Sequence, residues 1–270
     1  GLAGSWGDDW LEKQDRDGIS LAQALRRFGL DPDLISQAKR KSSELIGYLE
    51  LHIEQGPLLE SNDLALGVVT AINGAKRLNF SLKGMAGHAG TVPMSLRQDA
   101  LVGASELVLA IESIAKEFEV VATVGKIECF PSSVNVIPSD VSFSLDIRAP
   151  NNQQRDRALL AIMNTAQTIA SRRQLELNSD CFYSSDATPC STWLQEKLTN
   201  AVTAVQGRSM SLASGAGHDA IAIASLCEVG MLFMRCKDGV SHNPREAVQI
   251  DDIKLAVKVL EQTLYSLFEA

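Results

Sequence analysis

The sequence predicts an α/β protein that is interrupted by a ferredoxin-like α+β domain, and two observations carry this prediction. Apolar runs typical of strands alternate with helical patterns near both ends of the chain, as in an α/β layer. Between them, the elements of residues 76–186 follow the order β-α-β-β-α-β of the split βαβ unit. We therefore expect residues 1–75 and 187–270 to form the α/β domain, with residues 76–186 inserted into it as a second domain.

The elements of the α/β part follow from caps and periodicity. Ser20 is placed to cap a helix over residues 21–30, and a helical pattern that begins around Pro32 extends to residue 49. Two apolar runs typical of strands come next, and a helix, a strand and a closing helix follow the insert. The expected strands are 49–54, 64–72 and 229–235, and the expected later helices are 192–207 and 251–270.

The insert alternates apolar and polar residues in its strands, most clearly at Val141, Phe143, Leu145 and Ile147. We expect a four-stranded antiparallel sheet with two helices on one face. The expected strands are 77–84, 120–130, 141–149 and 174–182, and the expected helices are 96–118 and 152–173.

Composition excludes several classes of protein. A net charge of -8 argues against nonspecific binding to nucleic acid or to an anionic membrane. No apolar run approaches the roughly 20 residues that span a bilayer, and the first residues lack the layout of a secretory signal. The 5 cysteines are an odd number without a CxxC pair, which disfavours a disulfide framework. We expect a reducing, cytoplasmic setting.

His52 lies in the run LELHIEQGPLLE, between Leu51 and Ile53. In a strand, the alternation would place His52 with Glu50 and Glu54 on one face and the aliphatic residues on the other. One interpretation is a functional histidine at the end of a strand, where α/β proteins carry their chemistry. The alternative is a surface strand with a solvated polar face.

All four histidines of the chain lie in turns or at strand ends, which favours a shared polar site over separate structural roles. His218 follows glycines and begins a helix, where N–H groups favour an oxygen ligand, although an ordinary glycine turn has the same pattern. His242 precedes Asn-Pro and could be presented as a ligand or lie in a surface turn. His88 could donate to an oxyanion or occupy a plain hairpin.

Two further polar residues lie near the ends of the middle strands of the insert. Asn135 occurs in SSVNVIPS, and Arg148 occurs in LDIRAP. A guanidinium binds a carboxylate through two parallel N–H groups, so Arg148 could hold an acidic substrate. An arginine at a strand end is also commonly solvated.

Five motifs together resemble one family. They are ELHIEQGPLLE, GHAGTVPM with the following R and DAL, SVNVIP with FSLDIR, SGAGHDA, and GVSHNPREAV. In this order they are similar to the dinuclear-metal amidohydrolases that include allantoate amidohydrolases and N-carbamoyl-L-amino-acid hydrolases. The resemblance extends from about residue 49 to the end of the chain.

The resemblance implies a metallopeptidase-like α/β catalytic domain whose ferredoxin-like insert is a lid and dimerisation domain. It implies a homodimer in which lid residues complete the pocket of the neighbouring subunit, and two divalent metal ions, zinc or manganese, per subunit. Arg148 would bind the substrate carboxylate, and His88 would act catalytically near the developing oxyanion. By motif, the metal ligands are His52 and His242, and the substrate-binding residues are Gln55, His88, Asn135, Arg148 and His218.

The implied substrate is a small ureido compound with a carboxylate. The segments AGTVPMSLRQDA and MLFMRCKDGVSHNP favour allantoate, which would place the enzyme in purine nitrogen recovery. An N-carbamoyl-L-amino acid is the alternative substrate. A noncatalytic dimerisation or binding module is the alternative of another class.

The sequence departs from the family pattern in its metal ligands. No histidine precedes His52, and the family's His-x-Asp ligand, bridging Asp and Glu-Glu pair have no counterpart. A catalytic zinc generally takes three protein ligands. We therefore expect the N-terminal part of the catalytic domain to be missing, and the chain by itself to be metal-poor and inactive.

Overall fold

The computed structural model describes residues 1–7 and 9–268. The chain forms two compact units. Unit 1 contains residues 1–70, 190–212 and the chain from 217 onward, and unit 2 contains residues 71–189 and 213–216. Among the described residues, no helix is both long and apolar enough to cross a bilayer.

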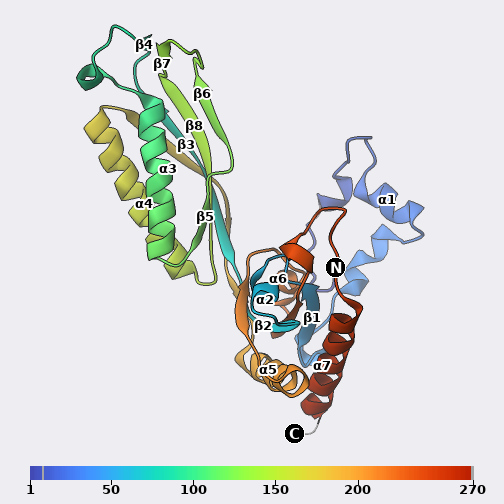
Figure 1. The fold of residues 1–270 in the computed structure, drawn as a ribbon. Helices are drawn as coiled ribbons and strands as arrows, with labels where there is room; N and C mark the ends of the chain where they lie inside the picture. The colour runs from blue at the N-terminus through green and yellow to red at the C-terminus, as the bar shows by residue number, and fades with distance from the viewer. Residues whose placement is uncertain (8, 269–270) are drawn as a thin grey trace. The chain divides into compact units, whose positions relative to one another are not determined.

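Unit 1 is built on strands that meet in parallel and antiparallel pairs (Figure 1). β12 (Val229–Met234) lies between β1 (Tyr48–Ile53), which is parallel to it, and β2 (Leu66–Ile72), which is antiparallel. β11 (Ser211–Ser214) also pairs with β2. The short β10 (Thr188–Pro189) pairs with residues 71 and 72 at the beginning of unit 2.

Helices complete the core of unit 1. α5 (Thr192–Gln206) and α7 (Ile250–Phe268) bury apolar residues such as Leu198 and Val259 with Leu232 of β12. Leu49, Leu51 and Ile53 of β1 pack against the same cluster. The short α6 (Ala220–Ile223) contacts β1 and β12. The predicted helices at 192–207 and 251–270 are therefore confirmed within the described residues, and residues 269 and 270 of the second lie outside them.

The segment before β1 differs in part from its prediction. α1 (Leu21–Arg27) begins at Ser20, whose hydroxyl accepts the N–H of Gln23 in a capping box, as expected. The predicted helix over 31–49 is wrong, because the chain forms only 3-10 turns there before β1 begins. Leu34 and Ile46 are exposed, so this segment has little apolar contact to stabilise a longer helix. The 3-10 turns are Trp10–Glu12, Pro32–Ala38 and Ser42–Glu44.

Unit 2 is built on a five-stranded antiparallel sheet with two helices (Figure 1), and two short strands at residues 87–88 and 136–137 form a separate pair. The strand order is β5-β8-β3-β9, and β6 also pairs with β8. The rings of Phe80 and Phe143 stack at 5.1 Å in the core beneath the helices. The strands are β3 (Gly74–Lys83), β5 (Val121–Thr123), β6 (Ile127–Phe130), β8 (Asp140–Ala149) and β9 (Glu176–Ser185), and the helices are α3 (Ala100–Glu117) and α4 (Asn152–Arg173).

The predicted fold class, an α/β protein with a ferredoxin-like insert, is confirmed. One detail differs, since the single strand expected at 120–130 is divided into β5 and β6 by residues 124–126. Gly125 lies in this interruption, where a residue without a side chain permits the chain to leave the ladder. Short elements complete the described chain: α2 (Leu58–Ser61), β4 (Gly87–His88), β7 (Val136–Ile137), and the 3-10 turns Met94–Leu96 and Lys237–Gly239.

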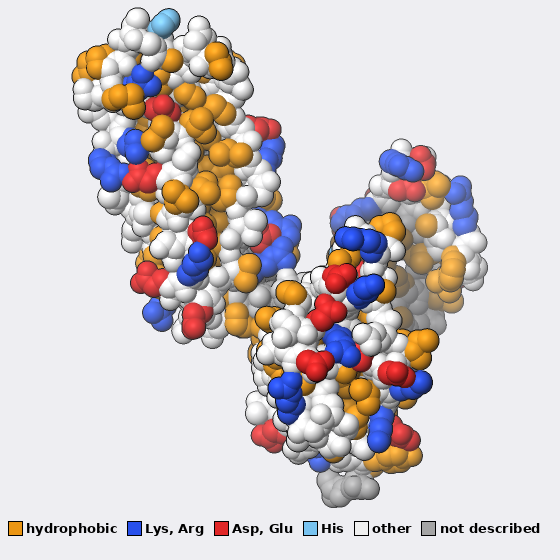
Figure 2. Space-filling view, viewed as in Figure 1, with side chains coloured by type: hydrophobic (Ala, Val, Ile, Leu, Met, Phe, Trp, Pro, Cys, Tyr) orange, Lys and Arg blue, Asp and Glu red, His pale blue; other side chains and the backbone are white. Residues whose placement is uncertain are grey.

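Unit 2 exposes apolar side chains on its surface. Figure 2 shows hydrophobic side chains gathered along this unit beside α3. Ile127 and Phe130 of β6 are 51% and 67% exposed, and Val134, which follows this strand, is exposed as well. Leu109 of α3 is also exposed. Because β5 and β6 both pair only with β8, they form one edge of the sheet.

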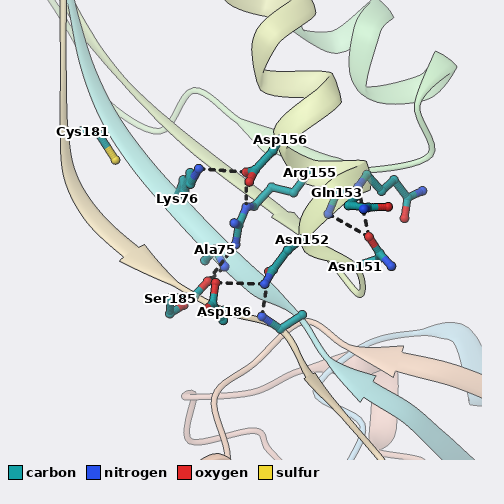
Figure 3. A network of polar contacts seen from close by, with 12 residues as sticks. Ala75, Lys76, Asn151, Asn152, Gln153, Arg155, Asp156, Cys181, Ser185 and Asp186 are labelled. Carbon is teal, nitrogen blue, oxygen red and sulfur yellow. Dashed lines mark hydrogen bonds and ion pairs between the residues drawn. The ribbon is translucent and has the colours of Figure 1, made fainter.

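A buried arginine ties the beginning of α4 to the end of β9 (Figure 3). Arg155 is only 2% exposed, donates to the Ser185 carbonyl at 2.7 Å and pairs with Asp156 at 3.0 Å. Asn152, at the start of the same helix, accepts the N–H of Ala187 and donates to Asp186. A buried guanidinium with these partners fixes the local backbone because its loss leaves them unpaired.

We predict that Arg155→Ala lowers the free energy of unfolding of unit 2 by about 2–3 kcal/mol, because a buried carbonyl loses its donor and a cavity forms. Arg157→Ala is the matched control, since Arg157 is on the same helix but exposed above the Phe118 ring. It should cost less than about 1 kcal/mol. Urea unfolding followed by circular dichroism measures both, and equal losses would contradict the role of Arg155.

Candidate functional site

β1 separates an apolar face from a polar one. Leu49, Leu51 and Ile53 pack into the core of unit 1, and the alternation directs Glu50 and His52 to the opposite face. The alternation expected from the sequence is therefore confirmed. β1 is paired along its whole length with β12, in which His52 lies opposite Phe233.

His52, His218 and Glu50 form one cluster on this polar face. The imidazole rings of His52 and His218 meet edge to face with centroids 4.6 Å apart. His218 Nδ1 lies 3.4 Å from Glu50 Oε1, and Glu50 Oε2 accepts the N–H of Ala220 at 2.9 Å. The carboxylate therefore links the His218 loop to the strand that carries His52. A cavity of about 550 Å³ is lined by Glu50, His52, Gly217, His218, Asp219 and Ile221.

Burial and the neighbouring imidazole determine the charge of His218. Its side chain is withdrawn from solvent, and this burial lowers the pKa of His218 below the ordinary histidine value. His52 lowers the pKa further, while Glu50 opposes both effects. A neutral imidazole is the form that accepts a hydrogen bond or binds a metal.

Gln55 and His242 come together in a second cluster of unit 1. The Gln55 amide donates to Ser241 Oγ at 2.6 Å and lies 3.4 Å from His242 Nε2. Both residues have positive φ, 57° for Gln55 and 54° for His242. The two loops approach so closely at Gly239 that a Cβ added there would lie 2.8 Å from the Gly56 carbonyl carbon. Only glycine fits at this contact.

The strand-to-helix turn after β1 is stabilised by a buried carboxylate. Glu54 is 9% exposed and accepts the N–H groups of Leu58 and Leu59 at 2.7 and 2.8 Å. These donors begin α2, where the first N–H groups have no partner inside the helix. Glu54 therefore has a structural role in this turn, although the alternation of the sequence groups it with His52.

The donor sets differ in how well they fit the implied metal ions. His52 Nδ1 lies 2.8 Å from the Ile53 carbonyl, which can only accept, so Nδ1 carries the proton and the Nε2 lone pair is open to a ligand role. In His242 the Nε2 atom instead lies 3.4 Å from the Gln55 amide nitrogen. Over residues 1–7 and 9–268, no three His, Cys, Asp or Glu side chains are grouped to hold a metal ion.

His88 and Asn135 lie together at one end of unit 2. β4 and β7 pair so that His88 is opposite Val136, and the Ala89 N–H donates to the Asn135 carbonyl at 2.9 Å. The imidazole is exposed, and its Nδ1 accepts the N–H of Gly90 at 3.1 Å. Since Nδ1 is an acceptor, the proton of the neutral ring is on Nε2.

Arg148 lies on the sheet face opposite the helices, beside a cavity of about 490 Å³. Its Nε and Nη2 donate to the two oxygens of Asp146 at 2.7 and 2.8 Å, and Nη1 donates to the Gly215 carbonyl at 2.6 Å. The hydrogen bond from Arg148 lowers the pKa of Asp146, and Arg77 adds to the effect. A guanidinium has five N–H groups, so one on each Nη is left for a carboxylate.

The structure does not bring Arg148 to His88 and Asn135. Residue 83 of β3 pairs with residue 140 of β8 at the His88 end of the sheet, whereas Arg148 pairs with Ala75 at the other end. The strand from Asp140 to Arg148 spans about 27 Å at 3.3–3.4 Å per residue. A single copy of unit 2 therefore cannot place all three side chains on one small substrate.

The comparisons with known proteins agree with these motifs. The model of peptidase family M20/M25/M40 matches residues 24–266. The chain belongs to this M20/M25/M40 family. It is 38% identical over 269 residues to an N-carbamoyl-L-amino-acid amidohydrolase of Pseudomonas sp., covering 98% of this chain and 65% of the relative. It is 38% identical to the allantoate deiminase of Arabidopsis thaliana, covering 94% of this chain and 54% of that protein.

Solved structures show the same fold. An amidase of the hydantoinase/carbamoylase family from Burkholderia multivorans superposes on this M20 family chain with a TM-score of 0.89 at 31% identity. The alignment covers 98% of this chain and 64% of that structure. The chain thus spans between 54% and 65% of the length of these relatives.

One residue of each unit that contacts a candidate residue was not itself selected from the sequence of this M20 family chain. Glu50 links His218 to β1, and Asp146 holds Arg148. Both stand two residues before a selected residue in a strand, so the same alternation that places His52 and Arg148 also places them on the same face. This spacing of two residues was the sequence signal that could have identified Glu50 and Asp146.

We predict that unit 1 becomes less stable below about pH 6.5. The unfolded chain takes up a proton near this pH, whereas folded His218, with its lowered pKa, does not, so the free energy of unfolding falls as pH falls. The three tryptophans, at 6, 10 and 193, are all in unit 1 and report its urea unfolding. Measurements need a chelator to remove bound metal.

The control for this prediction is a pair of substitutions. His218→Gln should reduce the dependence of stability on pH between 7 and 5.5, and His88→Gln, in unit 2, should leave it unchanged. The same slope in the wild type and in His218→Gln would contradict the assignment.

Proposed function

We propose that the whole protein is a metal-dependent amidohydrolase that cleaves a ureido C–N bond in a small substrate carrying a carboxylate. The observation that carries the proposal is the cluster of Glu50, His52 and His218 beside the cavity on the polar face of β1. Membership in the M20/M25/M40 family supports it, as do relatives named N-carbamoyl-L-amino-acid amidohydrolase and allantoate deiminase.

In this proposal His52 and His242 each hold one of two divalent ions, zinc or manganese. His52 is suited to this role because its Nδ1–H is bonded to a backbone carbonyl, which leaves Nε2 for the ion. When bound, such ions polarise a carbonyl group and lower the pKa of water toward neutrality.

The residues of this chain bind and orient the substrate. Arg148 takes the substrate carboxylate with its two remaining N–H groups, and Asp146 holds the guanidinium from the other side. His88 donates its Nε2–H to the ureido oxygen as negative charge develops there. Gln55, Asn135 and His218 orient the ureido group.

The proposed reaction is a hydrolysis in which water adds to the ureido carbonyl carbon. The bond from this carbon to the substrate nitrogen breaks, and the nitrogen leaves with a proton as an amine. The carbamate released from the terminal group breaks down to ammonia and carbon dioxide. For allantoate this removes one carbamoyl group.

We infer that unit 2 is a lid and dimerisation domain that supplies His88 and Asn135 to the neighbouring subunit. The separation of about 27 Å along β8 supports this arrangement, because a small substrate held by Arg148 cannot reach His88 of the same unit. A second copy of the chain can supply that end of its own unit 2. The exposed edge strand β6 and the apolar residues beside it favour such a pairing.

We predict that the full-length protein with zinc or manganese releases ammonia from allantoate, and that Arg148→Lys raises KM about 10-fold or more with a smaller change in kcat. An ammonium cannot form the two-bond contact that a guanidinium makes with a carboxylate. The panel is allantoate, N-carbamoyl-L-amino acids and ureidoglycolate. Elemental analysis should give about two ions per subunit.

The outcomes of this experiment are distinct. Faster turnover of N-carbamoyl-L-amino acids would replace allantoate by the alternative substrate. An unchanged KM in Arg148→Lys would remove Arg148 from the substrate site. A metal-free, inactive full-length protein would contradict the enzymatic proposal and favour a binding module.

We predict that two inactive variants, His88→Ala and Arg148→Ala, restore activity when their subunits are mixed. Random pairing of equal amounts makes half of the dimers mixed. If the site combines Arg148 of one subunit with His88 of the other, each mixed dimer has one intact site of two. About a quarter of wild-type activity then returns. Each variant refolded alone is the control, and no recovery in verified mixed dimers would contradict the shared site.

A further inference from the structure

We propose that Arg97 is a positioning residue that sets the tautomer and orientation of the His88 imidazole. The inference rests on the donor role that the proposed function gives to His88. It concerns the loop between β4 and α3, which carries His88 at its beginning and Arg97 near its end.

This loop has little regular structure or apolar packing to hold it. Its only regular element in the described chain is the 3-10 turn Met94–Leu96, in which Met94 is 75% and Leu96 is 68% exposed. Val92 is half-buried, but the larger apolar side chains of the loop are exposed, so its conformation depends largely on hydrogen bonds. Half-buried Arg97 supplies two of them from its side chain.

Arg97 closes the loop on two carbonyls. Its Nη2 donates to the Ala89 carbonyl at 2.6 Å, and its Nε donates to the Val92 carbonyl at 3.1 Å. The N–H groups of Thr91 and Val92 both approach the His88 carbonyl at 3.2 Å. The guanidinium thus stabilises the turn that follows His88.

The contact with Ala89 reaches the imidazole through one rigid peptide group. The Ala89 carbonyl, held by Arg97, and the Gly90 N–H belong to the same planar peptide unit. The Gly90 N–H donates to His88 Nδ1 at 3.1 Å. If this peptide rotates, the imidazole loses the donor that keeps the proton on Nε2.

The opposite side of Ala89 is fixed as well. The Ala89 N–H donates to the Asn135 carbonyl across β4 and β7. The space around Gly90 is also limited, because a Cβ there would lie 3.3 Å from His88 Cε1. Arg97 therefore completes a local frame in which one orientation of the 89–90 peptide is favoured.

The experiment compares Arg97→Met with Arg157→Met, an exposed arginine of α4, in the full-length metal-loaded protein. We expect kcat to fall about 10- to 100-fold in Arg97→Met with less than about a 3-fold change in KM, because a misplaced donor weakens transition-state stabilisation. Arg157→Met should change neither constant. Guanidinium ion at millimolar concentration should restore part of kcat in Arg97→Ala.

The second readout is the tautomer of His88, measured by ¹⁵N NMR of histidine-labelled protein and assigned with His88→Gln. We expect the Nε2–H form in the wild type and a mixture of both tautomers in Arg97→Met. Arg97→Lys, which can reach one carbonyl, should be intermediate and serves if the Met variant does not fold.

The results separate the two proposals. An unchanged His88 tautomer in a folded Arg97 variant, or an unchanged kcat where His88→Gln is inactive, would overturn the role of Arg97. If His88→Gln keeps full activity, the proposed function of His88 fails, and a mixture of tautomers in Arg97→Met would still support the positioning of the ring by Arg97.

Discussion

The ten-residue pairing of β3 with β8 determines where the proposed substrate-binding residues of unit 2 lie. A paired antiparallel ladder cannot shorten or bend sharply without losing hydrogen bonds, so its length is a fixed distance. It places Arg148 at one end and the His88 loop at the other. Because of this distance, Arg148 and His88 can act on one small substrate only if they come from two subunits.

Contacts with backbone groups select different tautomers in His52 and His88. His52 donates its Nδ1–H to a carbonyl, which leaves Nε2 as a lone pair, whereas His88 accepts an N–H at Nδ1, which leaves the proton on Nε2. The first arrangement suits a metal ligand and the second suits a hydrogen-bond donor. The contacts that select these tautomers come from residues close in sequence to each histidine, Ile53 one residue after His52 and Gly90 two residues after His88.

Carboxylates fix backbone and side chains beside the candidate residues within each unit. Glu50 bridges β1 and the His218 loop, Glu54 accepts the first N–H groups of α2, and Asp146 holds Arg148. Each carboxylate has at least two donors, which offsets its desolvation. Their proposed role is to fix side chains and backbone that would otherwise sample several conformations.

The sequence by itself determined the fold class, the faces of β1 and β8, and the placement of the four histidines in turns or near strand ends. These features depend on local periodicity and turn residues, which are readable along the chain. The helix expected over 31–49 failed because periodicity in Leu34 and Ile46 had no core to pack against. Only the tertiary structure decided the distance between His88 and Arg148 and the contact of Arg97 with the Ala89 carbonyl. Both depend on how strands pair and how a loop folds back on itself, which no local pattern encodes.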